Sequence, residues 1–138
     1  MKLRNSLLGI CLLLFLSVAV YAGGETCECN SPANGTHDPK EKVIYIPCGG
    51  NINWYLQIFI HNEISPPEHT SALAGITGDM YPPGPYILQH DLWGWYAWYS
   101  DDLSGGAYAF SGGTIRLITD CNNYKGGGGA QASASVWW

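Results

Sequence analysis

The stretch NINWYLQIFIH, residues 51–61, decides the fold class of this chain. Large apolar side chains recur at every second position, namely Trp54, Leu56, Ile58 and Ile60. The positions between them hold Tyr55, Gln57, Phe59 and His61. A period of two places each set on one face of an extended chain. The stretch therefore predicts an antiparallel β-strand with one buried face and one exposed face.

The rest of the chain repeats this pattern in shorter pieces. We expect further strands at 42–47, 85–89, 92–99, 107–110, 113–121 and 130–138. Turn-forming Gly, Pro, Asn and Asp separate them at 65–69, 78–85, 100–106, 111–113 and 122–129, and residues 70–76 could hold a helical turn. Short strands without alternating helices predict an all-β fold. We expect a single antiparallel β-sandwich, jelly-roll or immunoglobulin-like, of about seven to eight short strands.

The first 22 residues have the pattern of a cleaved signal peptide. Lys2 and Arg4 precede an apolar run over 7–20, and Val20 and Ala22 stand before the expected cleavage point. The run is shorter than the roughly 20 residues that cross a bilayer. We expect a signal peptide at 1–22, a disulfide-tethered N-terminal segment with the first strand at 23–50, and the remainder of the sandwich at 51–138. The protein is then secreted and extracellular, or periplasmic in a bacterium.

Four cysteines follow the predicted signal peptide, at Cys27, Cys29, Cys48 and Cys121. An even number of cysteines in an exported chain predicts disulfide bonds, two in this case. A bridge between Cys27 and Cys29 would close a cramped ring. Each of the two therefore pairs with Cys48 or Cys121, and both arrangements stay open.

Charge and motifs exclude several classes of function. Residues 23–138 carry eleven acidic and four basic residues, a net charge of −7. Such a surface repels phosphate backbones, so nucleic acid is not an expected partner and an anionic membrane is an unfavourable one. The chain contains no Gly-x-Ser-x-Gly, no His-Glu-x-x-His and no phosphate-binding glycine loop followed by lysine. We therefore do not expect an enzyme.

The stretch HDLWGWYAWYSDD, residues 90–102, suggests a binding surface. In a continuous strand over 92–99, Leu92, Tyr96 and Trp98 share the core face, and Trp93, Trp95 and Tyr99 share the exposed face. Contiguous exposed aromatic side chains mark binding surfaces, and indole rings stack on the C–H faces of sugars. Neighbouring carboxylates accept hydrogen bonds from sugar hydroxyls. The sequence predicts a lectin-like module that binds a neutral glycan through Trp93, Trp95, Tyr99, Asp91, Asp101 and Asp102.

Other functions stay open at this point. The chain could be a structural or adhesive subunit at an extracellular surface that self-associates through exposed strands, or a small secreted hydrolase or toxin. Adjacent carboxylates in SDDLSGG, residues 100–106, make calcium a possible ligand. We expect no other cofactor and no further metal site.

Overall fold

The structure is a computed structural model that describes residues 23–32, 36–63, 69–94, 96–124 and 128–138. The predicted signal peptide lies outside these residues. Within them the chain forms nine strands: β1 (Gly24–Ser31), β2 (His37–Ile46), β3 (Gly50–Asn62), β4 (His69–Gly78), β5 (Met80–Tyr81), β6 (Tyr86–Trp93), β7 (Trp98–Ala109), β8 (Gly113–Asn123) and β9 (Gly128–Trp137). No helix in the described ranges is long and apolar enough to cross a membrane.

Two antiparallel sheets confirm the predicted β-sandwich. The five-stranded sheet has the order β1-β9-β3-β7-β5, and the four-stranded sheet has the order β2-β8-β4-β6. Strands that follow one another in the chain lie in opposite sheets, so every connection crosses from one layer to the other. This alternation is the jelly-roll form of the prediction, because an immunoglobulin-like sandwich also pairs consecutive strands within one sheet.

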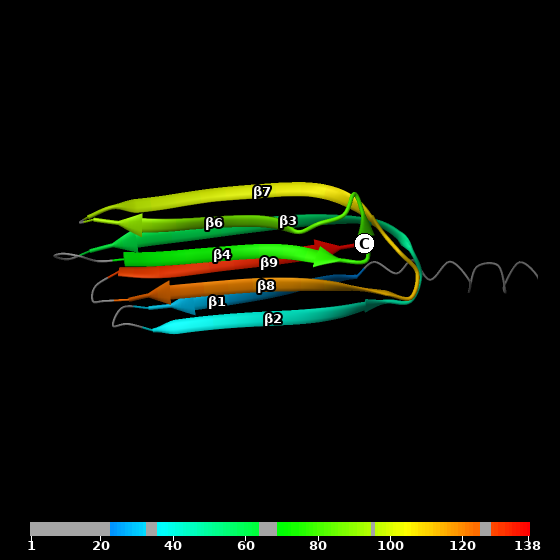
Figure 1. The fold of residues 1–138 in the computed structure, drawn as a ribbon, viewed down its shortest axis with the longest axis horizontal. Helices are drawn as coiled ribbons and strands as arrows, with labels where there is room; N and C mark the ends of the chain where they lie inside the picture. The colour runs from blue at the N-terminus through cyan, green and yellow to red at the C-terminus, as the bar shows by residue number, and fades with distance from the viewer. Residues whose placement is uncertain (1–22, 33–35, 64–68, 95, 125–127) are drawn as a thin grey trace, which may run out of the picture.

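The long strands run alongside one another, so their connections gather at two ends of the domain (Figure 1). We call the end where β1, β3, β6 and β8 finish the loop end. The opposite end is the terminal end, because Gly23 and Trp138 meet there. Each donates a backbone hydrogen bond of 3.0 Å to the carbonyl of the other.

The predicted alternation of β3 builds the core between the sheets. Its inward side chains are buried, and branched residues of β4 and β8 in the opposite sheet face them. The largest of these fully buried apolar side chains are Ile52, Leu56, Ile58, Ile60, Ile76, Ile115 and Leu117. Burial of each stabilises the fold by roughly 1.5–3 kcal/mol. The neighbouring strand β9 contributes Ala130, Ala132, Ala134 and Val136 to the same layer.

One disulfide joins the two sheets. Cys29 of β1 and Cys121 of β8 both point into the core, with their Cα atoms 5.8 Å apart. This bridge is one of the predicted pairings, but the expected second bridge is wrong. Cys27 and Cys48 are free thiols: Cys27 is buried, 3.6 Å from the Thr119 hydroxyl between the sheets, whereas Cys48 is exposed in the connection from β2 to β3.

The prediction of one strand over 92–99 is wrong. β6 ends at Trp93 and β7 begins at Trp98, and the residues between them carry the chain from one sheet to the other. Gly94 and Tyr96 have φ angles of 113° and 47°, values of the left-handed region that end an extended strand. Buried Asn62 holds this turn, because its Nδ2 donates hydrogen bonds of 3.2 Å to the carbonyls of Leu92 and Gly94.

Three further predictions of local structure are wrong. Residues 70–76 form most of β4 rather than a helical turn, with Thr70, Ala72, Ala74 and Ile76 alternating inward. Residues 100–106 belong to β7 rather than to a turn. Residues 23–50 hold two strands rather than one, since β1 precedes β2 and pairs with β9.

Candidate functional site

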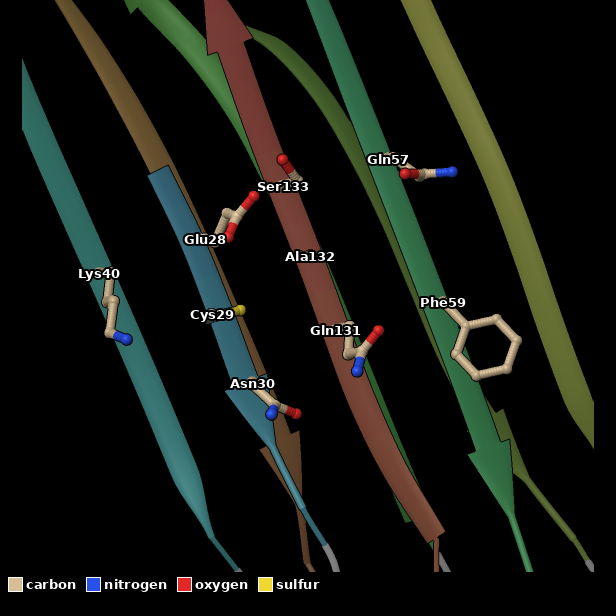
Figure 2. Close-up of a pocket in the computed structure, with 9 residues that line it drawn as sticks. All are labelled: Glu28, Cys29, Asn30, Lys40, Gln57, Phe59, Gln131, Ala132 and Ser133. Carbon is tan, nitrogen blue, oxygen red and sulfur yellow. The ribbon is translucent and has the colours of Figure 1, made fainter. Parts of the chain in front are cut away.

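A shallow groove lies on the outer face of the five-stranded sheet, away from the core (Figure 2). Its volume of about 470 Å³ falls in the range of roughly 300–1,000 Å³ that is typical of ligand pockets. Three neighbouring strands, β1, β9 and β3, form its floor, and a side chain of β2 lies beyond β1. The lining residues are Glu28, Cys29, Asn30, Lys40, Gln57, Phe59, Gln131, Ala132 and Ser133.

Strand register arranges the outward side chains of the groove in two rows. One row runs from Asn30 through Gln131 to Phe59, and the other runs from Glu28 through Ser133 to Gln57. All six project outward because they occupy the positions of β1, β9 and β3 that alternate with core residues. The groove therefore presents amide, hydroxyl and carboxylate groups at regular strand spacings, both donors and acceptors of hydrogen bonds.

Phe59 gives the groove an aromatic surface at its end nearer the loop end. The ring is 41% exposed, and His61 packs against it at a tilt of 39° with 5.7 Å between ring centroids. This contact limits the orientations of the Phe59 ring while leaving part of its surface open. An apolar ring beside rows of amides suits a ligand that has both C–H faces and hydroxyl groups.

The charges at the side of the groove formed by β1 and β2 are partly neutralised. The Lys40 ammonium lies 3.1 Å from the Asp38 carboxylate, which also accepts a hydrogen bond of 3.0 Å from the backbone N–H of Asn30. That backbone hydrogen bond, followed by the bond from Lys40, lowers the pKa of Asp38 below its ordinary value. Among the groove residues, Glu28 is the carboxylate without an ion-pair partner in the described part of the chain.

The structure does not bring the six predicted site residues together. Asp91 and Trp93 share the outer face of the four-stranded sheet, on β6. Asp102 lies on the outer face of the other sheet, opposite Gln57 in register. Trp95 lies outside the described residues. The predicted surface is thus divided between the two sides of the sandwich.

Tyr99 packs inward rather than outward. Its ring stacks on His90 of β6 at 3.6 Å between centroids and 10° between planes, and it contacts the core. Its hydroxyl donates a hydrogen bond of 2.9 Å to Asp101, and this bond raises the pKa of Tyr99 above its ordinary value. Conversely, Trp98, predicted to be in the core, is 72% exposed, and Tyr96 is also exposed. The faces are reversed after Trp93 because β6 ends at this residue and β7 begins at Trp98 in the other sheet, so the alternation does not continue between them.

No group of three or more potential metal ligands occurs among the described residues. Asp101 and Asp102 are adjacent in an extended strand, so their side chains leave β7 on opposite faces. The loop on which the calcium prediction depended is therefore absent from the described structure at 100–106.

The groove residues were not selected from the sequence, although part of the signal was present. The alternation of 51–61 sets Gln57 and Phe59 on the face opposite the large apolar residues. In 130–138, Gln131 and Ser133 alternate with alanines. The sequence did not indicate that β9 lies between β1 and β3. The two rows form because these three strands are neighbours in the sheet.

Comparisons with known proteins identify similar folds. No protein-family model matches the chain, and no curated protein matches its sequence. A solved structure of TmCBM61 in complex with beta-1,4-galactotriose is similar, with 12% identity, a TM-score of 0.44, and coverage of 83% of this chain and 85% of that one. The EclA C-terminal domain, a sugar-binding protein, has 13% identity, a TM-score of 0.38, and coverage of 85% and 80%.

A third similar structure is the enzymatically active domain of tailspike protein 4 of bacteriophage CBA120. It has 14% identity and a TM-score of 0.38, and the match covers 80% of this chain but 17% of that one. With TM-scores below 0.5, these similarities say nothing about which ligand this chain binds.

Proposed function

We propose that this domain is a secreted, non-catalytic module that binds a neutral glycan in the groove of the five-stranded sheet. The observation that carries the proposal is the pair of register rows, which sets Gln57, Gln131 and Ser133 beside the exposed ring of Phe59. Amides and hydroxyls exchange hydrogen bonds with sugar hydroxyls, while an aromatic ring stacks on the C–H face of a sugar. The groove is open to solvent, so a chain of several sugars can lie along it.

The charges of the groove favour binding over hydrolysis. Glycoside hydrolysis needs two carboxyl groups on opposite sides of the scissile bond, about 5–9.5 Å apart. The groove is lined by one carboxylate, Glu28, and the nearby carboxylate of Asp38 is neutralised by Lys40. An inter-sheet disulfide is typical of proteins that function in an oxidising compartment, in accord with secretion.

The test compares two phenylalanine truncations in the domain of residues 23–138. A glycan array first identifies a ligand, and calorimetry then measures its affinity for Phe59→Ala and Phe110→Ala. Phe110 is the matched control, because its ring is 48% exposed and lies outside the groove. We expect Phe59→Ala to weaken binding by about tenfold, since stacking and burial together are worth on the order of 1–2 kcal/mol. Phe110→Ala should leave the affinity unchanged.

Two outcomes contradict the proposal. If no glycan binds, or if the two variants have equal affinity, the groove is not the site. The solution mass of the same preparation tests the main alternative, a structural subunit. Concentration-dependent oligomers without any glycan response would support self-association instead.

A further inference from the structure

A second surface stands on the opposite side of the sandwich. Trp93 at the end of β6, His69 at the start of β4 and Tyr124 directly after β8 form a row of three parallel rings, which we call the aromatic row. His69 stacks on Trp93 at 3.9 Å and 8°, and on Tyr124 at 4.4 Å and 4°. The three strands are neighbours in the four-stranded sheet, so the row crosses that sheet at the loop end.

Backbone pairing fixes the positions of these rings. His69 and Trp93 are direct partners in the ladder between β4 and β6, and the N–H of Tyr124 donates a hydrogen bond of 3.0 Å to the carbonyl of His69. The His69 ring, held between its two neighbours, limits the orientation of the indole. A side chain that is already ordered loses little conformational entropy when a ligand binds.

Among the described residues, one face of the Trp93 indole is left open. β6 is the edge strand of its sheet, so no strand in this part of the chain covers the ring on the side away from His69. The side chain is accordingly 63% exposed although one of its faces is stacked. This leaves an indole surface of fixed orientation, available for a flat or apolar ligand group.

A carboxylate lies close to the aromatic row. Asp91 projects from β6 on the same face as Trp93, and its Oδ1 is 3.6 Å from the Nε2 of His69, longer than a hydrogen bond. Other carboxylates of this sheet face have closer partners. Asp120 lies 2.7 Å from the Nε2 of His37, and Glu41 lies 3.0 Å from the Nε of Arg116.

We propose that the open face of Trp93 and the carboxylate of Asp91 form a second site, which binds an amino sugar that carries a positive charge. Tryptophan is the best aromatic partner for a cation, and a carboxylate forms short, strong hydrogen bonds with an ammonium group. The C–H face of the sugar ring stacks on the indole while its ammonium group reaches Asp91. The net charge of −7 in residues 23–138 adds a long-range attraction for such a ligand.

The test uses two oligosaccharides that share a backbone and differ at the amino group, which is charged in one and acetylated in the other. The domain is titrated with the tetramer of β-1,4-linked glucosamine and with its fully N-acetylated form, which is neutral. We expect the glucosamine tetramer to bind at least tenfold more tightly, to change tryptophan fluorescence, and to bind more weakly as salt is added. Asp91→Asn removes the charge with little change of shape, and should abolish the preference for the glucosamine tetramer.

Matched controls separate a defined site from a general attraction to an acidic surface. Asp102→Asn removes an exposed carboxylate on the opposite face, and Trp137→Ala removes an indole that is 43% exposed there. Neither should weaken binding, whereas Trp93→Ala should reduce it at least tenfold. Equal affinities for the two tetramers, or equal effects of Asp91→Asn and Asp102→Asn, would overturn the proposal.

The two proposed sites can fail independently. Phe59→Ala should leave the glucosamine titration unchanged, because the groove and the aromatic row lie on opposite outer faces. Loss of glucosamine binding in Phe59→Ala, but not in Trp93→Ala, would assign that ligand to the groove and reject the aromatic row.

Discussion

The packing of Trp54 explains a glycine in the middle of a strand. Gly105 of β7 lies directly beneath the Trp54 indole, where an added Cβ would come within 2.5 Å of Cζ2 of the ring. The ring is buried and also stacks on Tyr86, with 4.7 Å between centroids. It therefore has little room to move away. The glycines of 100–106 predicted a turn, but at position 105 the glycine provides space for an indole.

Gly105→Ala should therefore destabilise the domain. Overpacking of a core costs about 1–3 kcal/mol, which we expect as a decrease in the free energy of unfolding measured in urea. The next residue supplies the control, because a Cβ on Gly106 would meet its nearest atom at 3.5 Å, an ordinary contact. Gly106→Ala should leave the stability unchanged or slightly increased. Similar losses in both variants would show that strand flexibility, rather than the Trp54 contact, is the cause.

At the scale of elements, sequence alternation predicted the strands whose two faces differ most in chemistry. The strands predicted at 51–61 and 113–121 lie within β3 and β8, and the strand predicted at 130–138 matches β9 over 130–137. Each of the three alternates core residues with mostly polar ones. β1 was missed because its inward positions are Cys27, Cys29 and Ser31 rather than large apolar residues. The inward residues of β4 are similarly weak signals, because Ala72 and Ala74 are small and alanine is also the best helix former.

The stretch 92–99 could not be interpreted correctly from its aromatic content. Its face assignment depended on one continuous strand, whereas the turn beginning at Gly94 depends on a buried asparagine, Asn62, that is distant in the sequence. The prediction of an exposed Trp93 was right, because Trp93 precedes the turn. The predictions for Tyr96, Trp98 and Tyr99 failed together because Tyr96 lies between the two strands and the other two residues belong to β7.

The disulfide should contribute strongly to the stability of the sandwich. Cys29 and Cys121 are 92 residues apart, and in the chain-entropy model a loop of this length corresponds to roughly 4.5 kcal/mol. We expect the double variant Cys29→Ala/Cys121→Ala to lose about 2–5 kcal/mol in urea unfolding. Cys48→Ala, at the exposed free thiol, should change stability by less than about 0.5 kcal/mol. An unchanged unfolding midpoint in the double variant would contradict this role.

The domain has few basic residues, and most of these form ion pairs with carboxylates. Lys40 pairs with Asp38, Lys42 pairs with Glu25, and Arg116 pairs with Glu41, while Lys125 lies outside the described residues. The ion pairs thus strengthen the conclusion drawn from net charge alone. A polyanion that approaches this surface meets unpaired carboxylates and cations that are already engaged.

The domain should consequently not bind polyanions. We expect no retention on immobilised heparin and no mobility shift of duplex DNA at about 50 mM salt, a condition that favours phosphate contacts. An anion-exchange resin should retain the same preparation, which would verify that it carries a net negative charge. Retention on heparin would reveal a basic patch and contradict the expectation.

The groove shows why the sequence can predict a class of ligand without identifying the residues that bind it. Sugar-compatible residues are frequent in this chain, and alternation indicates which of them face solvent. The groove, however, forms because β9 lies between β1 and β3 in the sheet, although β9 is far from both strands in the sequence. The sequence contains no local signal for that placement, and the candidate site follows from it.

The meeting of Gly23 and Trp138 has a mechanical consequence. β1 is an edge strand that runs antiparallel to β9, and both strands have a terminus at the same end of the sandwich. A pulling force between these two residues acts across the ladder, so it breaks the backbone hydrogen bonds one after another rather than all at once. Peeling of β1 stops at Cys29, where the disulfide transmits the tension to β8 in the opposite sheet. We therefore expect a force applied between Gly23 and Trp138 to separate β1 from β9 at a low load until the separation reaches the disulfide at Cys29.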